Sequence, residues 1–241
     1  MEKYTRYSRK DTNRNLDHKN EELMTEILQL TRVWKDLGNP SVVHDKEKQI
    51  SGIDYISPTY GNIDAKLITV FNFYTFSQEL AFIDKSFRWQ EGWISKENST
   101  DKYLFLYAEV EGYEDNYAKA KHNFSKDTIT RLRAILVDKK KLQNEIHKTF
   151  KKEFNYYGKE PYTKYKKEFD DLVPIRLDEN LEKVEKPHVT QKPYIMCSWG
   201  GMNGKPFLPE RPINFVVSIK MLKEISDKIW EINFNRKKIK N

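Results

Sequence analysis

Residues 52–68 read GIDYISPTYGNIDAKLI, and both the fold and the function hypotheses depend on this stretch. Apolar and β-branched residues on both sides of Ser57-Pro58-Thr59-Tyr60-Gly61 predict two short strands joined by a turn. Asp54 lies on the first strand, and Asp64 and Lys66 lie on the second. Side chains two residues apart on a strand point to the same face, so Asp64 and Lys66 are expected to project together.

The chemistry of these three side chains indicates a hydrolytic metal site. If the strands pair as a hairpin, the carboxylate of Asp54 comes close to that of Asp64. Two converging carboxylates repel each other unless a hard cation lies between them, and Mg²⁺ (or Mn²⁺) prefers such oxygen ligands. The ammonium of Lys66 could then orient the attacking water, or deprotonate it if its own pKa is depressed. The alternative is a pair of surface carboxylates beside a solvated lysine.

The predicted elements along the chain are a helix, several strands and then strand–helix units, which is typical of a mixed α/β fold. Residues 21–37 have apolar side chains at spacings of three and four, which predicts a helix that ends at Gly38 and Pro40. Residues 1–20 are polar and are expected to be flexible. Residues 76–84 could form either a strand or a helix.

The second half of the chain repeats a strand–cap–helix pattern. Residues 102–110 read KYLFLYAEV and predict a buried strand. Arg131 to Val137 predicts a strand, with Asp138 as the N-cap of a helix that runs through Phe150. The same layout recurs where Val217-Ser218 leads into a later helix. Between the two units, residues 151–192 are rich in Lys, Glu and Tyr without a clear period, which indicates either a functional insertion or a mobile arm.

Composition narrows the class of protein. The chain has 241 residues, of which 13% are aromatic, too many for a disordered chain. No apolar run reaches the length of about 18 residues that a membrane helix needs. The N-terminus lacks the apolar core of a signal peptide. The sequence therefore predicts a cytoplasmic protein with no membrane partner, and it is compatible with a homodimer.

The charge is unevenly distributed. Lys and Arg outnumber Asp and Glu by one in residues 1–149 and by six in residues 150–241. A basic face attracts polyanions, nucleic acid first, so DNA is the expected partner. The alternatives are a lysine-rich soluble protein and a solvated charged helix with tyrosines packed beneath it. The lysines expected to contact DNA phosphates are Lys139, Lys140, Lys141, Lys151, Lys152, Lys164, Lys166 and Lys167.

The run Gly-Ile-Asp followed by Ile-Asp-x-Lys resembles the PD-(D/E)xK (restriction-endonuclease-like) nuclease superfamily. The resemblance covers roughly residues 22–142 and includes further short blocks. Ile53 replaces the nominal proline of the family, and Asp64 stands where Glu is commoner. Ala65 is smaller than the usual residue. The further blocks are Gln49, Thr75-Phe76 with Glu79, Gly92-Trp93 and Thr100-Asp101-Lys102-Tyr103-Leu104.

The resemblance implies a mixed central sheet flanked by helices and a Mg²⁺-dependent deoxyribonuclease. The implied core spans residues 21–150, followed by the insertion at 151–192 and a basic strand–strand–helix extension at 193–241. Catalysis would involve Lys66, with contributions from Glu79 and Gln49. The metal ligands would be Asp54, Asp64, the Ala65 carbonyl, and Glu22 or Glu26 of the opening helix.

Two other functions stay open at this point. A nuclease-like fold without catalytic activity could bind DNA or another protein in bacterial defence or counter-defence. A purely structural interaction protein would leave Asp54, Asp64 and Lys66 exposed and far apart. The positions of these three side chains in the structure distinguish these functions from one another.

Overall fold

The structure is a computed structural model that describes residues 6–45, 52–72, 75–83, 89–94, 100–114, 116–171, 173–185, 192–197 and 211–234. The chain divides into two compact units, and each is built from separate segments of the sequence. The first unit comprises Met1–Phe73, Ser99–Asp138 and Ser226–Asn241. The second unit comprises Tyr74–Asn98 and Lys139–Ile225.

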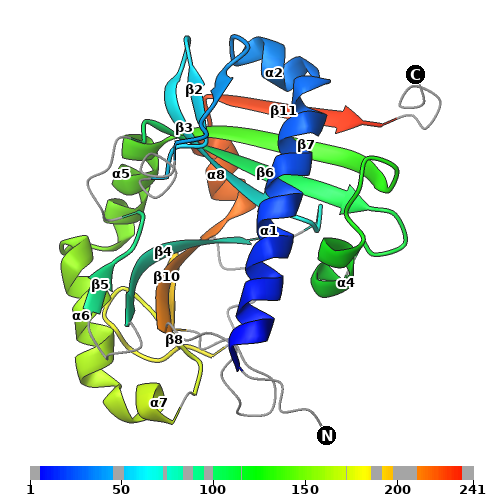
Figure 1. The fold of residues 1–241 in the computed structure, drawn as a ribbon. Helices are drawn as coiled ribbons and strands as arrows, with labels where there is room; N and C mark the ends of the chain where they lie inside the picture. Colours follow the sequence, from blue (N-terminus) through cyan, green and yellow to red (C-terminus); the bar gives the residue numbers. More distant parts are fainter. Residues whose placement is uncertain are drawn as a thin grey trace, which may run out of the picture. The chain divides into compact units, whose positions relative to one another are not determined.

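A mixed sheet forms the centre of the first unit (Figure 1). Among the described residues, six strands pair in the order β1-β2-β3-β6-β7-β11. The β3–β6 pair is parallel and the other pairs are antiparallel. The strands are β1 (Ser41–Val42), β2 (Tyr55–Ser57), β3 (Gly61–Ile68), β6 (Lys102–Val110), β7 (Ile129–Asp138) and β11 (Lys228–Asn233).

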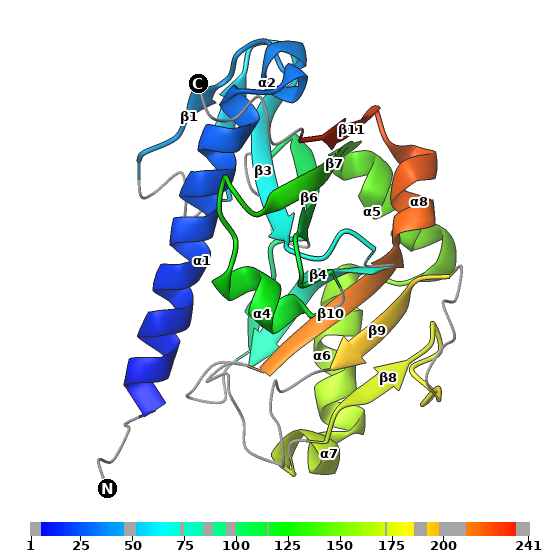
Figure 2. The ribbon, with the colours of Figure 1, turned by 90° about the vertical axis from the view of Figure 1, so that its right-hand side faces the viewer.

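Helices cover one face of this sheet. The helices of the first unit are α1 (Arg6–Gln29), α2 (Arg32–Asp36) and α4 (Tyr117–His122). Figure 2 shows α1 lying along the sheet. The buried residues of this layer form one hydrophobic core. The helices contribute Met24, Ile27, Leu28, Val33, Trp34 and Ala120, and Leu37 is the C-cap of α2. The strands contribute Tyr55, Ile63, Leu104, Leu106, Ala108, Leu132, Ala134, Leu136 and Trp230.

The first helix differs from its expected bounds at both ends. It begins at Arg6, so residues 6–20 are helical, consistent with the lack of Gly and Pro in this stretch. It ends at Gln29, and a second short helix starts after Thr31. The Thr31 hydroxyl donates to the Leu28 carbonyl (2.8 Å) and accepts from the Val33 amide (3.2 Å). This N-cap bond divides the predicted 21–37 helix in two.

The turn predicted at residues 57–61 is confirmed. The Ser57 hydroxyl accepts from the amides of Thr59 (3.1 Å) and Tyr60 (3.0 Å) and donates to the Leu37 carbonyl (2.6 Å). Gly61 follows with φ +76°, in the left-handed region that favours glycine. The turn therefore joins β2 and β3 as an antiparallel pair.

The second unit is an antiparallel sheet with helices packed on it (Figure 2). Its described strands pair in the order β5-β4-β10-β9-β8. The rings of Phe150, Tyr157 and Phe215 meet within 6.2 Å of one another in its core. The elements are β4 (Thr75–Ile83), β5 (Trp89–Glu91), α5 (Lys139–Thr149), α6 (Phe154–Lys164), α7 (Lys166–Asp170), β8 (Ile175–Leu177), β9 (Tyr194–Cys197), β10 (Arg211–Ser218) and α8 (Ile219–Ile225).

Several predicted elements match the structure. The buried strand at residues 102–110 is β6, and the strand–helix unit around Asp138 is β7 followed by α5. Residues 76–84 fall largely on β4, so the strand alternative holds over Phe76–Ile83. Ser218 accepts a hydrogen bond from the Met221 amide (3.1 Å), as expected of an N-cap.

The organisation of the second half differs from the expected insertion and extension. Within residues 151–192 lie α6, α7 and β8, and their buried side chains belong to the second unit. Residues 193–241 do not form a separate extension. They supply β9 and β10 to the second unit and β11 to the mixed sheet of the first. The boundaries are invisible in the sequence because distant segments pair within each sheet.

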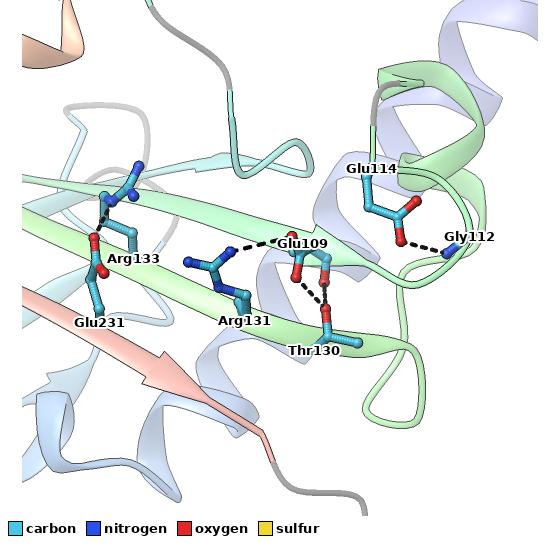
Figure 3. A network of polar contacts seen from close by, with 7 residues as sticks. All are labelled: Glu109, Gly112, Glu114, Thr130, Arg131, Arg133 and Glu231. Carbon is cyan, nitrogen blue, oxygen red and sulfur yellow. Dashed lines mark hydrogen bonds and ion pairs between the residues drawn. The ribbon is translucent and has the colours of Figure 1, made fainter.

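A polar network ties together the strands of the mixed sheet beyond its core (Figure 3). The guanidinium carbons of Arg131 and Arg133 lie 4.0 and 4.3 Å from the centroid of the Phe71 ring. Arg131 also pairs with Glu109 on β6 (3.7 Å), and Arg133 pairs with Glu231 on β11 (2.7 Å). Because each arginine has a carboxylate partner, the network links β6, β7 and β11 rather than presenting a net positive charge.

No helix in the described ranges is long and apolar enough to cross a membrane.

Two features require glycine at position 61, the backbone conformation and the lack of space for a Cβ atom, and together they give a stability prediction. A Cβ at Gly61 would lie 2.3 Å from Asp101 Oδ2, and its φ is +76°. Gly112 has the same φ of +76°, but nothing lies within 4 Å of its Cβ position. Gly112→Ala should therefore cost about 1 kcal/mol of unfolding free energy, and Gly61→Ala roughly 2–4 kcal/mol. Urea denaturation followed by tryptophan fluorescence measures both, and equal costs would contradict a steric clash with Asp101.

Candidate active site

The candidate site lies where β2 and β3 stop pairing. The last backbone bond between the two segments joins the Asp54 amide to the Ile63 carbonyl (2.9 Å). Beyond it the Ala65 amide donates to Oδ2 of Asp54 (2.7 Å). A side-chain carboxylate therefore takes the place of the next backbone carbonyl, and it is held against the strand that carries Asp64.

Asp64 and Lys66 lie on the same face of β3, as the two-residue spacing predicts. Lys66 Nζ is 2.7 Å from Asp64 Oδ1. The Asp64 side chain is 1% exposed and that of Lys66 is 28% exposed. The second oxygen of Asp64, Oδ2, is buried and has no hydrogen-bond partner within the described ranges. The site thus contains one buried carboxylate oxygen that accepts no bond.

The environment of Asp64 favours its protonated form. The pKa of Asp64 is raised to about 7, chiefly by burial and also by the negative charge of Asp54, while Lys66 acts in the opposite direction. The effect of Asp54 indicates that its carboxylate lies near that of Asp64. A carboxylic acid with a pKa so far above its usual range is a common feature of functional sites.

The ammonium of Lys66 is stabilised in its charged form. Burial acts to lower the pKa of Lys66, but the charges of Asp64, Asp54 and Glu21 outweigh it, and the pKa is raised from its usual value. The depressed pKa that proton abstraction requires is therefore not found. An orienting role for Lys66, by hydrogen bonding as a cation, fits the structure better than a role as general base.

Among the acids on α1, the one nearest to this cluster is Glu21 rather than Glu22 or Glu26. Glu21 contributes to the raised pKa of Lys66 and to that of Tyr55, which is next to Asp54. Glu22 pairs instead with His18 (3.6 Å), and Glu26 pairs with Lys126 (2.6 Å). Glu22 and Glu26 were expected as metal ligands, and all three acids are exposed and line the cavity. Glu21 differs from the other two in its charge effect on the pKa values of Lys66 and Tyr55.

A hydrogen-bonded chain joins this turn of α1 to β2. The Thr25 hydroxyl donates to the Glu21 carbonyl (2.9 Å), so it accepts from the Tyr55 hydroxyl at 2.8 Å. Helical spacing could have revealed Glu21, because it precedes the buried residues Met24 and Leu28 by three and seven positions.

A cavity of ≈ 490 Å³ lies between α1 and the strands. Asp54 and Ala65 reach its wall, and Glu21 approaches from the helix. Its remaining lining mixes acidic, histidine and apolar side chains: His18, Glu22, Met24, Thr25, Glu26, Gln29, Val42, Val43, His44, Tyr55, Leu67 and Leu106. Asp54 thus borders the cavity, whereas Asp64 is not among its lining residues.

Two other residues, Glu79 and Gln49, were expected at the site. Glu79 lies on β4 of the second unit, where it pairs with Asn214 of β10. A Cβ at Gly92 would lie 2.3 Å from the Glu79 carbonyl oxygen, so packing against β4 explains this glycine. Gln49 lies outside the described residues.

The lysines expected to bind DNA are heterogeneous. Lys139 is buried, at 7% exposure, which removes it from the phosphate-binding set. The other seven are exposed, and several have acidic or aromatic neighbours. Lys164 pairs with Glu182 (2.6 Å), Lys166 pairs with Asp170 (2.5 Å), and Lys152 lies 3.8 Å from the centroid of the Tyr156 ring.

A ready-made metal centre is not found: no group of three or more His, Cys, Asp or Glu side chains in the described ranges is arranged to hold an ion. Comparison of the chain with models of protein families, with curated proteins and with solved structures finds no match. The chemistry of the site therefore follows from its own side chains alone.

The coupling between the two aspartates gives a pH prediction. Since the pKa of Asp64 is raised from 3.8 to about 7, the unfolded chain loses this proton first, and the contribution of Asp64 to stability falls as the pH rises between these values. Asp54→Asn removes the neighbouring charge but keeps an oxygen for the Ala65 amide. It should lower the pKa of Asp64, as measured by carboxyl ¹³C NMR titration of the metal-free protein.

The matched control is Glu114→Gln, which changes an exposed acid bonded to the Gly112 amide (3.0 Å). It should leave the pKa of Asp64 unchanged. An unaltered titration of Asp64 in the Asp54→Asn variant would show that the carboxylates are too far apart to share a ligand.

Proposed function

We propose that this chain is a metal-dependent nuclease that hydrolyses DNA phosphodiester bonds through Asp54, Asp64 and Lys66. The observation that carries the proposal is the buried carboxylate of Asp64, held between the Lys66 ammonium and the neighbouring Asp54 where β2 and β3 diverge. The resemblance to PD-(D/E)xK nucleases and a restriction-endonuclease-like fold for the first unit are part of this proposal.

A structural role explains this arrangement poorly. Burying the Asp64 carboxylate near a second carboxylate raises the free energy of its ionised form. An apolar residue at position 64 would avoid this cost, as Ile63 does one position earlier with an exposure of 0%. A site that binds a cation offsets the repulsion when the ion is bound, which supports the metal-dependent reading.

The donor set suits a hard divalent cation. Asp64 Oδ2 is buried and accepts no hydrogen bond within the described part of the chain, so it is available as a ligand. Asp54, the Ala65 carbonyl and Glu21 supply further oxygen atoms, and these three residues line the cavity between α1 and the strands. These are oxygen ligands of the kind Mg²⁺ and Mn²⁺ prefer, and we assign the helix ligand to Glu21 in place of Glu22 and Glu26.

The protein's own groups would then have distinct roles. A bound Mg²⁺ or Mn²⁺ would polarise the phosphoryl oxygen and make the attacking water more acidic. Lys66, charged and fixed by Asp64, would donate a hydrogen bond to that water or to a phosphate oxygen and so orient it. Asp54 would hold its carboxylate in place through the Ala65 amide, without rearrangement when substrate arrives.

A second function has one specific observation in its favour. Asp54 Oδ2 already accepts from the Ala65 amide, and Asp64 Oδ1 already pairs with Lys66. A nuclease-like fold that only binds DNA or protein could keep such a self-satisfied cluster for stability. That alternative predicts no cleavage with any metal ion and no effect of the site on DNA affinity.

Catalysis should be lost when either end of the ion pair is changed. Asp64→Asn removes a charged ligand, and Lys66→Met removes the orienting ammonium. Each should reduce cleavage of plasmid and linear DNA by about two orders of magnitude or more, while DNA affinity in a gel-shift assay changes little. Glu114→Gln serves as the control and should cleave like the wild type. Full cleavage by both site variants would remove Asp64 and Lys66 from the mechanism.

Metal binding should depend on pH in a defined direction. Asp64 must lose its proton to coordinate a cation, and its pKa is about 7. The affinity for Mn²⁺, measured by calorimetry, should therefore be weaker at pH 6 than at pH 8, and cleavage should stop with EDTA and return with Mg²⁺. A wild-type protein that cleaves DNA under complete chelation contradicts the proposed chemistry.

The DNA contacts proposed for the second unit are tested by salt dependence. Lys140 and Lys167 are exposed members of the lysine set. Replacing both with alanine should lower the slope of log affinity against log salt by about 2, because each neutralised phosphate contributes about 0.9. Lys220→Ala changes an exposed lysine outside the set and serves as the control. An unchanged slope in the double variant would place the DNA elsewhere.

A cytoplasmic location and a homodimer remain predictions from the sequence.

A further inference from the structure

The dipeptide Thr100-Asp101 contacts the backbone on both sides of the acidic cluster. The Thr100 hydroxyl donates to the Gly52 carbonyl at 2.9 Å. Asp101 Oδ2 accepts from the Asn62 amide at 2.8 Å, and the Asp101 amide donates to the Asn62 carbonyl at 2.9 Å. Gly52 precedes Asp54 by two residues, and Asn62 precedes Asp64 by two residues. One dipeptide therefore holds both segments that carry the carboxylates.

The anchor is itself well fixed. Thr100 is buried, at 5% exposure. The next residue, Lys102, begins β6 and bonds Asp138 and Asp227 at 2.8 Å each. The backbone at Gly52 has φ +81°, a left-handed conformation that costs a non-glycine residue about 1–2 kcal/mol. The start of β6 is thus tied to β7, to the segment before β11 and to both acid-bearing segments.

We propose that Thr100 and Asp101 are positioning residues that set the separation between the Asp54 and Asp64 carboxylates and so preorganise the cation site. This inference rests on the proposed metal site. The Asp54 amide bonds the Ile63 carbonyl (2.9 Å), but the ladder between β2 and β3 ends before Asp64. The three bonds from the dipeptide add a second constraint, at the same distance in sequence from each acid.

The first test removes the threonine hydroxyl. Thr100→Val keeps the shape of the side chain but leaves the Gly52 carbonyl without this donor. Mn²⁺ affinity measured by calorimetry should fall about ten-fold, as is typical when a group that orients a metal ligand is lost. Thr100→Ser keeps the hydroxyl and should restore most of the affinity.

The matched control separates positioning from general destabilisation. The Thr31 hydroxyl makes the same kind of buried bond to a carbonyl, that of Leu28, within the same unit. Thr31→Val should lower thermal stability without changing Mn²⁺ affinity. If Thr31→Val weakens Mn²⁺ binding as much as Thr100→Val does, the effect is one of stability and the inference is overturned.

Asp101 is tested in the same way. Asp101→Ala removes the acceptor of the Asn62 amide and should also weaken Mn²⁺ binding about ten-fold. Asp101→Asn keeps an acceptor oxygen in the same place and should recover most of it. Wild-type affinity in Asp101→Ala would remove this residue from the positioning pair.

A readout without metal keeps the inference distinct from the proposed function. The Ala65 amide bonds to Asp54 Oδ2, so its hydrogen exchange reports whether Asp54 stays against β3. Exchange at Ala65 should be at least several-fold faster in Thr100→Val than in Thr31→Val. If this holds but the wild type binds no Mn²⁺, the proposed function fails and the positioning role stands. If Ala65 exchanges at the wild-type rate in Thr100→Val, the positioning role fails whatever the metal data show.

Discussion

The structure of the first unit depends on the hydrogen bond made by the Ala65 amide. This amide donates to the side-chain carboxylate of Asp54, where a carbonyl of the neighbouring strand would otherwise be the acceptor. Backbone amides at a sheet edge need an acceptor, and Asp54 provides one while leaving β2 free to turn away. The divergence opens the cavity between the strands and α1. Without this bond, the Ala65 amide would lie at an open edge of β3, and that edge would lie beside a buried charged residue. Both features are unfavourable.

The electrostatics of the cluster follow from its position at this divergence. Asp64 is buried in the sheet, yet its neighbour Lys66 is only partly covered, so the pair spans the boundary between low and high dielectric. The pKa values of both groups are raised, so the Asp64 carboxyl is hard to ionise and the Lys66 ammonium is hard to neutralise. In such a pair, a contact between Asp64 and a bound ligand can replace the contact between Asp64 and Lys66.

Local pattern predicted much of the fold and part of the site. The two-residue period placed Asp64 beside Lys66, and the turn chemistry at Ser57 gave the strand pair that brings in Asp54. Glu21 was missed: its helical spacing places it on the face of Met24 and Leu28, but the sequence does not show that this face borders a cavity. The mixed sheet was only partly foreseen, since the pairing of β7 with β11 joins residues far apart in the chain and leaves no local signal.

The interleaving of the two units has a consequence for biosynthesis. The chain leaves the first unit after Phe73, returns at Ser99, leaves again after Asp138 and returns at Ser226. The strand that completes the mixed sheet therefore emerges from the ribosome after the other described strands, and Trp230 on that strand bonds Asp36 (2.7 Å) across 194 positions of sequence. Until it arrives, β7 is an uncovered sheet edge and Asp36 lacks this partner. A nascent or prematurely terminated chain would thus be exposed to aggregation through that edge, although every residue of the acidic cluster had already been made.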